Sequence, residues 1–166
     1  MEIGIHPTVV VMGVSGCGKT TVGLVLAHQL GVPFADADDF HSAEAKAKMA
    51  AGHPLTDEDR APWLRRLADW LAGEKDGCVL ACSALKYRYR AVLRSGSPQL
   101  CFLHLVGEPA VVAERVAHRS GHYMPASLVA SQYADLEPLR PDEFGIAIDF
   151  TLSQEQIVER FLKEVQ

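Results

Sequence analysis

Residues 13–20 read Gly13-Val14-Ser15-Gly16-Cys17-Gly18-Lys19-Thr20, which matches the phosphate-loop pattern G-x-x-x-x-G-K-[ST] in full. Glycines in this pattern let the backbone curl, so that successive N–H groups point at phosphate oxygens and the following helix presents its positive end. The lysine, here Lys19, reaches the β- and γ-phosphates, and the Thr20 hydroxyl coordinates Mg²⁺. The sequence therefore predicts a binding site for a nucleoside triphosphate.

The segments on either side of this loop favour the same interpretation. Thr8–Met12 is an apolar run typical of a strand that is buried on both faces. From Lys19 to Leu30 the apolar residues recur with helical spacing, and Gly31 ends the pattern. The alternative, a glycine turn with an idle lysine, would need neither a strand before it nor a helix after it.

The rest of the chain alternates between strand-like and helix-like segments. Further strands are expected at 33–35, 78–82, 100–106 and 146–150, and helices at 43–51, 56–71, 87–94, 109–119, 127–136 and 153–165. This alternation predicts an α/β fold, a five-stranded parallel sheet with right-handed crossovers and helices on both faces. The chain has 166 residues and no linker or repeat, so we expect a single domain over residues 1–166.

The composition is that of an ordinary globular protein, with 48% hydrophobic and 22% charged residues. The net charge of −5 makes the chain a poor candidate for a general binder of nucleic acid or anionic membranes. The apolar runs are short, so neither a signal peptide nor a membrane span is expected. The four cysteines form no C-x-x-C pair, which predicts buried, reduced thiols in a cytoplasmic protein.

The acidic residues narrow the class of nucleotide-binding protein. The chain contains no asparagine, which excludes the N-K-x-D motif by which GTPases read guanine. The strand at 78–82 also lacks the closing acid that motor and transporter ATPases place beside Mg²⁺. Instead, Asp36 and Asp38 follow the second strand, where one carboxylate can hold the water shell of the metal and the other a substrate hydroxyl. The alternative is a solvated acidic turn.

Several further blocks carry a family resemblance. They are Asp36-Ala37-Asp38-Asp39-Phe40-His41, residues 48–64 (KMAAGHPLTDEDRAPWL), residues 82–86 (CSALK) with Tyr89-Arg90, residues 121–125 (GHYMP) and Ser131-Gln132-Tyr133. Together they resemble the thermoresistant-type gluconokinases, which belong to the shikimate kinase-like group of P-loop kinases. The most specific block is G-x-P-L-x-D-x-D-R-x-P-W, which shikimate kinases do not share. One departure is Ala45, where the family usually has asparagine.

The resemblance implies a five-stranded parallel sheet, an enzymatic activity and ligands for it. It implies transfer of the γ-phosphoryl group of ATP to D-gluconate, with Mg²⁺, and often a homodimer. The helical segment at about 40–72 is expected to bind substrate, and residues of about 118–126 are expected to form a mobile lid. Lys19 and Mg²⁺ would neutralise the phosphates, with Thr20 on the metal and Asp36 behind its waters. Asp38 would hold and deprotonate the attacking hydroxyl.

The remaining expected site residues are mostly cations. Arg115 and Arg119 lie four residues apart on one helix face, and lids of this kinase group carry arginines that cover the phosphates; otherwise they are surface arginines. Substrate binding is expected from Asp38, His41, Lys48, Arg60, Lys86 and Arg90. An arginine can grip the carboxylate of gluconate with two hydrogen bonds, which favours Arg60 for that role. Alternatively, Arg60 pairs with Asp57 or Asp59 and only steadies a helix.

Other functions stay open from the sequence alone. The basic stretch from Lys86 to Arg94 is interleaved with tyrosines and could bind nucleic acid, although the acidic chain argues against it. Another kinase of the group could act on shikimate or a different sugar acid. A nucleotide-binding sensor without turnover is a further alternative. Asp38 speaks against a sensor, because a sensor has no need of a base.

Overall fold

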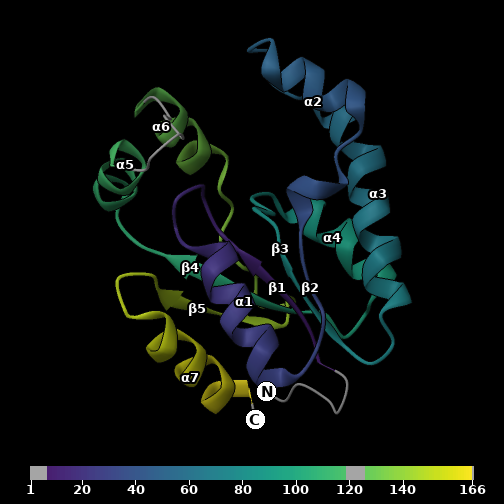
Figure 1. The fold of residues 1–166 in the computed structure, drawn as a ribbon, viewed down its shortest axis with the longest axis vertical. Coiled ribbons are helices and arrows are strands. Elements are labelled where there is room, and N and C mark those ends of the chain that lie inside the picture. Colours follow the sequence, from purple (N-terminus) through teal and green to yellow (C-terminus); the bar gives the residue numbers. More distant parts are fainter. Residues whose placement is uncertain (1–6, 119–125, 166) are drawn as a thin grey trace.

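The computed structural model describes residues 7–118 and 126–165, built around a five-stranded parallel sheet (Figure 1). The strands are β1 (Thr8–Met12), β2 (Phe34–Asp36), β3 (Cys78–Ala81), β4 (Cys101–Val106) and β5 (Gly145–Asp149), and their order across the sheet is β2-β3-β1-β4-β5. The predicted sheet is confirmed, with strand ends within a residue or two of those expected. The chain moves from β1 to one side of the sheet and later to the other, and ligands bind at such a reversal, beyond the carboxyl ends of the strands.

Helices cover both faces of the sheet, as predicted. They are α1 (Lys19–Leu30), α2 (Ala43–Ala50), α3 (Asp57–Gly73), α4 (Tyr87–Gly96), α5 (Pro109–Ala117), α6 (Ala126–Asp135) and α7 (Gln154–Val165). In Figure 1, α1 and α7 lie together near the two termini, while α3 and α4 lie on the other side of the strands. A short 3₁₀ helix, η1 (Ala37–Phe40), was not predicted and follows β2 directly. Within the described residues, none of the helices combines the length and apolar character that a membrane crossing requires.

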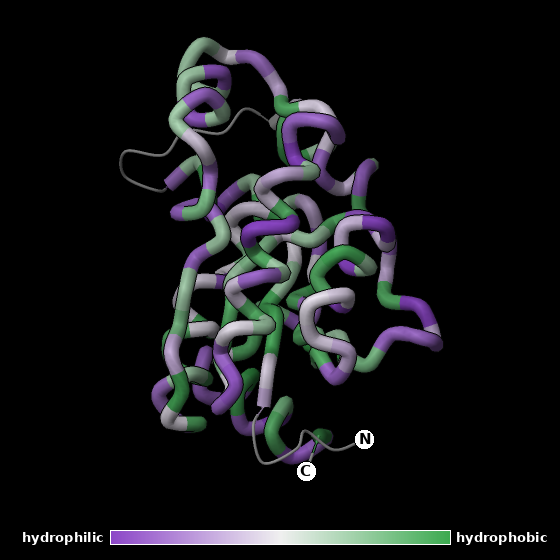
Figure 2. Tube along the Cα trace, turned by 90° about the vertical axis from the view of Figure 1, so that its right-hand side faces the viewer, coloured by the Kyte–Doolittle hydropathy of each residue, from purple (hydrophilic) through white to green (hydrophobic). Residues whose placement is uncertain are grey.

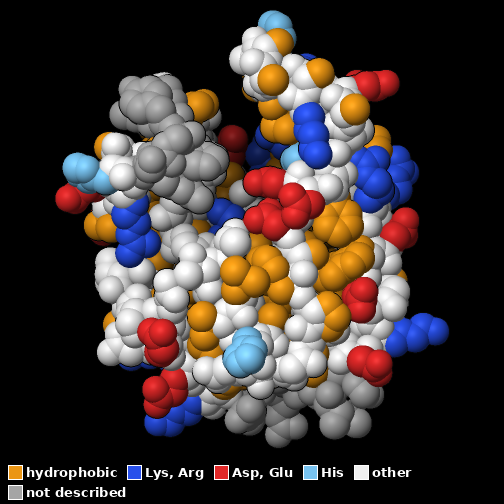
Figure 3. Space-filling view, in the orientation of Figure 1, with side chains coloured by type: hydrophobic (Ala, Val, Ile, Leu, Met, Phe, Trp, Pro, Cys, Tyr) orange, Lys and Arg blue, Asp and Glu red, His pale blue; other side chains and the backbone are white. Residues whose placement is uncertain are grey.

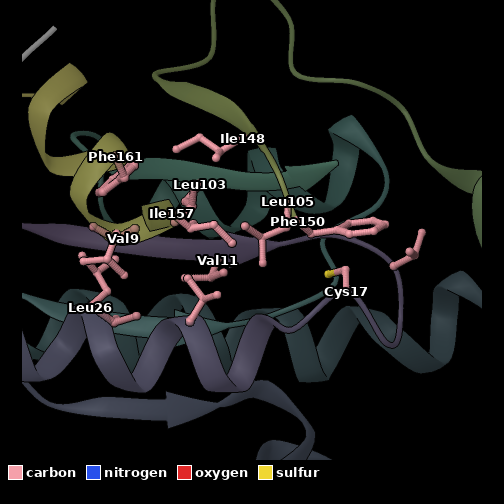
Figure 4. Close-up of a cluster of buried hydrophobic side chains, with 14 of the residues drawn as sticks. Val9, Val11, Cys17, Leu26, Leu103, Leu105, Ile148, Phe150, Ile157 and Phe161 are labelled. Carbon is pink, nitrogen blue, oxygen red and sulfur yellow. The ribbon is translucent and has the colours of Figure 1, made fainter. Parts of the chain in front are cut away.

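The central strand β1 packs against helices on both of its faces. Val9 and Val11 belong to one fully buried cluster, and Figure 4 shows them beside Leu26 of α1 and Phe161 of α7. The alternate residue Val10 belongs to a second cluster, which contains buried leucines of α3 and α4. Figure 2 shows the hydrophobic segments concentrated along these inner strands. Burial on both faces explains why the strand reads as a continuous apolar run.

The helix α2 is attached mainly by polar contacts. None of its residues is buried. Lys48 of α2 donates to the carboxylate of Asp59 at 2.5 Å, and Asp59 also accepts the N–H of Thr56 at 2.8 Å in the capping box that begins α3. The ammonium of Lys48, followed by these capping bonds, lowers the pKa of Asp59 to about 2. A charged carboxylate therefore serves both as a helix cap and as the tether of α2.

Arg90 is a fully buried arginine that joins three segments of the chain. Its Nε donates to Glu143 at 2.7 Å and its Nη2 to the same carboxylate at 3.0 Å. The other Nη donates to the carbonyl of Ala84 at 2.8 Å. Ala84 has a φ of +46°, in the left-handed region that costs a non-glycine residue about 1–2 kcal/mol. The buried guanidinium thus holds the strained turn after β3 against the loop before β5.

We expect replacement of Arg90 to destabilise the whole protein. Arg90→Met would leave the buried carboxylate of Glu143 without its counter-charge, a loss of about 3–5 kcal/mol in the free energy of unfolding. Urea denaturation followed by circular dichroism measures this quantity. Arg65→Met, at an exposed position of α3, is the control and should stay within about 0.5 kcal/mol of the parent. Equal stability of the two variants would contradict the structural role of Arg90.

Candidate active site

A cavity of about 1080 Å³ opens beyond the carboxyl ends of the strands. The phosphate loop, β2 with η1, the start of α3, the loop after β3, and α6 all contribute to its wall. Figure 3 shows this end of the molecule as a hollow, with a group of acidic side chains bordering it below α2. The cavity lies where the fold places ligands in parallel sheets.

The phosphate loop needs glycine at defined positions. Gly13 has a φ of +147°, and a Cβ there would lie 2.9 Å from the carbonyl oxygen of Leu105. Gly16 has a φ of +84°, and its Cβ would lie 2.8 Å from a methyl carbon of Val116. Cys17 is buried, which raises the pKa of its thiol, so it fills space as a neutral side chain. Lys19 extends over the loop, where its Nζ donates to the Val14 carbonyl at 3.0 Å.

Thr20 and Asp36 form a pair of oxygen ligands at one end of this loop. The Thr20 hydroxyl donates to Oδ2 of Asp36 at 3.0 Å. The other oxygen of Asp36 accepts the N–H of Asp38 at 3.0 Å and so caps η1. A hydroxyl and one carboxylate fit Mg²⁺, which takes few protein ligands and completes its shell with water and substrate phosphates. The two residues predicted to hold the metal are therefore brought together.

Asp38 projects from η1 into the same cavity. Its side chain is 88% exposed, and it has no hydrogen bond among the described residues that would block a substrate hydroxyl. Its pKa is raised, first because the surrounding cavity walls remove part of its water and second because the carboxylate of Asp36 lies nearby. Water still reaches the carboxylate, because the side chain is largely exposed. A raised pKa suits a group that must accept a proton.

His41 lies flat against Trp63 beside this carboxylate. The two rings stack with centroids 4.4 Å apart and an angle of 11° between their planes. Trp63 is fixed by a hydrogen bond from Nε1 to the carbonyl of Ala37 at 2.8 Å. Burial lowers the pKa of His41 although Asp38 lies 3.8 Å from its Nε2, so the imidazole is neutral near pH 7. Its Nδ1 is buried and has no hydrogen-bond partner among the described residues.

Arg60 reaches the cavity from the first turns of α3. Its Nη1 donates to the hydroxyl of Tyr89 at 3.3 Å and lies 3.9 Å from Asp57. The Tyr89 hydroxyl in turn donates to Asp57 at 2.5 Å, and this hydrogen bond is the first reason that the pKa of Asp57 is lowered. The contact with Asp57 is the alternative expected from the sequence, but the guanidinium also lines the cavity. Its remaining donors can therefore meet an anionic ligand.

Comparison with known proteins adds an independent observation. Residues 15–165 match the shikimate kinase family model. The chain is 42% identical to a gluconokinase from Gluconobacter oxydans (strain 621H), over 99% of this chain and 95% of that protein. The chain belongs to the gluconokinase family.

Solved structures agree with this membership. A gluconokinase from Sinorhizobium meliloti 1021 superposes with a TM-score of 0.87 at 42% identity, covering 96% of this chain and 91% of that one. A sugar kinase from Janibacter sp. HTCC2649 has the same TM-score at 53% identity, covering 95% and 94% of the two chains. Membership in the gluconokinase family makes the chain a nucleotide-binding phosphotransferase, and the fold expected from the resemblance is confirmed.

The structure separates the other predicted cations of this gluconokinase-family chain. Arg90 was expected near the substrate, but its side chain points into the core and its donors are used by Glu143 and backbone carbonyls, so it does not reach the cavity. Lys48 is engaged by Asp59. Lys86 lies 5.8 Å from the centre of the Tyr89 ring. Neither Lys48 nor Lys86 is among the described residues that line the cavity.

Of the two predicted lid arginines, the described residues include Arg115 but not Arg119. Arg115 lines the cavity, donates to the carbonyl of Phe150 at 3.0 Å and reaches that of Cys17 at 3.5 Å. Figure 4 shows Cys17 and Phe150 together at this end of the core. Arg115 therefore borders the phosphate loop, as a residue that covers phosphates would. Arg119 and the expected lid residues 119–125 lie outside the described residues.

Some cavity residues that contact predicted site residues were not themselves predicted as part of the site. Tyr89, Trp63 and Gln132 all line the cavity, and each bonds or stacks with a predicted site residue. Tyr89 and Trp63 lie inside blocks that carry the family resemblance, and Gln132 lies in Ser131-Gln132-Tyr133. The family pattern was thus the available signal, because no local motif links these side chains to the phosphate loop or to Asp36-Ala37-Asp38.

We expect Asp38→Asn to lower kcat by about 10²-fold or more, the usual contribution of a positioned general base. Affinity for Mg-ADP, measured by calorimetry, should change little. Because the pKa of Asp38 is raised, kcat/KM of the parent should fall as the pH drops through a value above the ordinary aspartate range.

The neighbouring Asp39→Asn is the matched control for this prediction. Asp39 is exposed in the same 3₁₀ helix and does not line the cavity. Its kcat should stay within about threefold of the parent, since exposed substitutions away from the site have small effects. Equal losses in the two variants would show that charge near η1, rather than proton acceptance by Asp38, governs the rate.

Proposed function

We propose that the protein transfers the γ-phosphoryl group of ATP to the 6-hydroxyl of D-gluconate, giving ADP and 6-phospho-D-gluconate. The observation that carries this proposal is the meeting of Lys19, the Thr20–Asp36 pair and Asp38 on one cavity, in a chain of the gluconokinase family. A neutralised triphosphate and a base for a hydroxyl are the two requirements of such a transfer. The cytoplasm, where thiols stay reduced, suits the four free, buried cysteines.

The residues divide the chemistry among them. The N–H groups of the phosphate loop and Lys19 hold the β- and γ-phosphates, and Arg115 adds a further cation beside the same loop. Thr20 and Asp36 would hold Mg²⁺, which neutralises charge on the phosphate oxygens. Asp38 orients the acceptor hydroxyl and takes its proton as the bond to phosphorus forms and the bond to the leaving ADP oxygen breaks. His41 lines the cavity beside Asp38 and would contact the substrate with the edge of its neutral ring.

The opposite end of gluconate carries a carboxylate, which must be anchored away from the γ-phosphate. Arg60 supplies a cation at a part of the wall formed by α3, and Tyr89 holds one of its nitrogens. A guanidinium can meet a carboxylate with two parallel hydrogen bonds, which gives direction as well as charge. Residues 40–72 thus form the substrate-binding part of the single kinase domain.

A substrate panel tests the proposed function. ADP release is coupled to a spectrophotometric assay with gluconate, shikimate, glucose and a nucleoside monophosphate as alternative acceptors. We expect turnover with gluconate, and little with neutral glucose, because glucose lacks the carboxylate that Arg60 would bind. Activity with shikimate but not gluconate would replace the proposed substrate. No turnover with any acceptor, together with tight ATP binding, would support the sensor alternative.

Arg60→Leu tests the carboxylate anchor. Loss of a charged partner in a desolvated site should cost about 2–4 kcal/mol in kcat/KM for gluconate. ATP affinity and melting temperature should barely change, because Arg60 makes its contacts at the α3 side of the cavity. Arg65→Leu places the same change on the exposed face of the same helix and should behave like the parent. A lower melting temperature with unchanged KM for gluconate would assign Arg60 to helix stability instead.

A further inference from the structure

Gln132 of α6 contacts the phosphate loop at two points. The N–H of Ser15 donates to Oε1 of Gln132 at 2.6 Å, and Nε2 of Gln132 donates to the Ser15 hydroxyl at 3.0 Å. A backbone N–H can only donate, so the amide oxygen must face it and the NH₂ group must face the hydroxyl. The two residues are 117 positions apart in the chain and line the same cavity. The phosphoryl transfer proposed above assigns no role to Gln132.

One peptide group links this contact to Lys19. The peptide bond between Val14 and Ser15 is planar, so its N–H and its C=O turn together. Gln132 holds the N–H, and the C=O accepts a hydrogen bond from Nζ of Lys19 at 3.0 Å. The amide of Gln132 therefore holds the N–H edge of this peptide group, while the ammonium of Lys19 and the N–H of Cys17, the latter at 3.3 Å, hold its carbonyl edge. If that plane turned, the carbonyl that receives the ammonium of Lys19 would turn with it.

The helix that carries Gln132 is itself fixed to the sheet. The hydroxyl of Tyr133 donates to the carbonyl of Gly107, just beyond β4, at 2.9 Å. After α6, the N–H of Glu137 donates to the carbonyl of Leu85 at 2.7 Å. These bonds tie α6 to the loops that follow β4 and β3. The side chain of Gln132 therefore approaches the phosphate loop from a rigid support, as accurate positioning requires.

We propose that Gln132 is a positioning residue for phosphoryl transfer, which orients the peptide between Val14 and Ser15 and, through it, the ammonium of Lys19. The inference rests on the proposed function only in taking Lys19 as the group that neutralises the transferred phosphate. A misplacement of about 1 Å at a reacting centre can cost roughly 10²-fold in rate. Loss of the contact should therefore lower kcat while the protein stays folded and still binds nucleotide.

Gln132→Met tests this proposal, because methionine has a similar length and lacks the hydrogen-bonding amide. We expect kcat to fall by about 10- to 100-fold. The Kd for Mg-ADP should change by less than about threefold, and Tm by no more than a few degrees. The same comparison is made for slow ATP hydrolysis without any acceptor, so that a wrong choice of gluconate does not affect it. Gln29→Met, at an exposed position of α1, is the matched control and should keep the parental kcat.

A double variant separates positioning from a general structural effect. If Gln132 acts through Lys19, then adding Gln132→Met to Lys19→Met should lower the single-turnover rate by less than about threefold further, since coupled residues are not additive. Independent, multiplicative losses would overturn the proposal. So would a parental kcat in Gln132→Met, or a loss of kcat accompanied by an equal loss of ADP affinity and a lower Tm. A suppressed second loss with retained ADP binding supports it.

Discussion

The buried ion pair between Arg90 and Glu143 is the interaction on which the floor of the cavity depends. Both side chains are fully buried, so water cannot replace a lost hydrogen-bond partner. The buried guanidinium is therefore stable only while each of its donors keeps an acceptor within the protein. Those partners include the carbonyl of Ala84, in the turn after β3, and the carbonyl of Pro138, in the loop before β5. In the same turn, the carbonyl of Ser83 accepts a hydrogen bond from the N–H of Gly13, the first residue of the phosphate loop. A charge in the core thus sets the position of the loop that meets phosphate.

The cavity wall separates the two ends of the reaction by charge. Loop amides, Lys19 and Arg115 make the side of the phosphate loop positive, whereas η1 contributes carboxylates on the side where the proposed acceptor hydroxyl would lie. The neutral His41 between Asp38 and the indole of Trp63 adds polarity without adding a second cation. This arrangement would keep Asp38 effective as the proposed base, because none of the lysines and arginines in the described part of the chain forms an ion pair with it.

Much of this could be predicted from local patterns, and the remainder depends on contacts between distant segments. The apolar runs and the glycine spacing predict the sheet, the helices and a phosphate loop that brings Lys19 and Thr20 to the cavity, because each follows from neighbours in the chain. The burial of Arg90 could not be predicted in this way, since it depends on Glu143, 53 residues further on. Without that partner, Arg90 was predicted to face an anionic substrate, because it lies in a basic stretch interleaved with tyrosines. Gln132 was missed for the same reason.

The attachment of α2 has a consequence for the local stability of the molecule. Hydrophobic burial supplies most of the free energy that opposes local unfolding, and α2 contributes no buried side chain. Its amide hydrogens should exchange with solvent far faster than those of β1, through openings that leave the sheet intact. Met49 of α2 nevertheless lines the cavity. One wall of the cavity therefore belongs to a helix with little protection against local opening, and a ligand bound there can reshape it without disturbing the core.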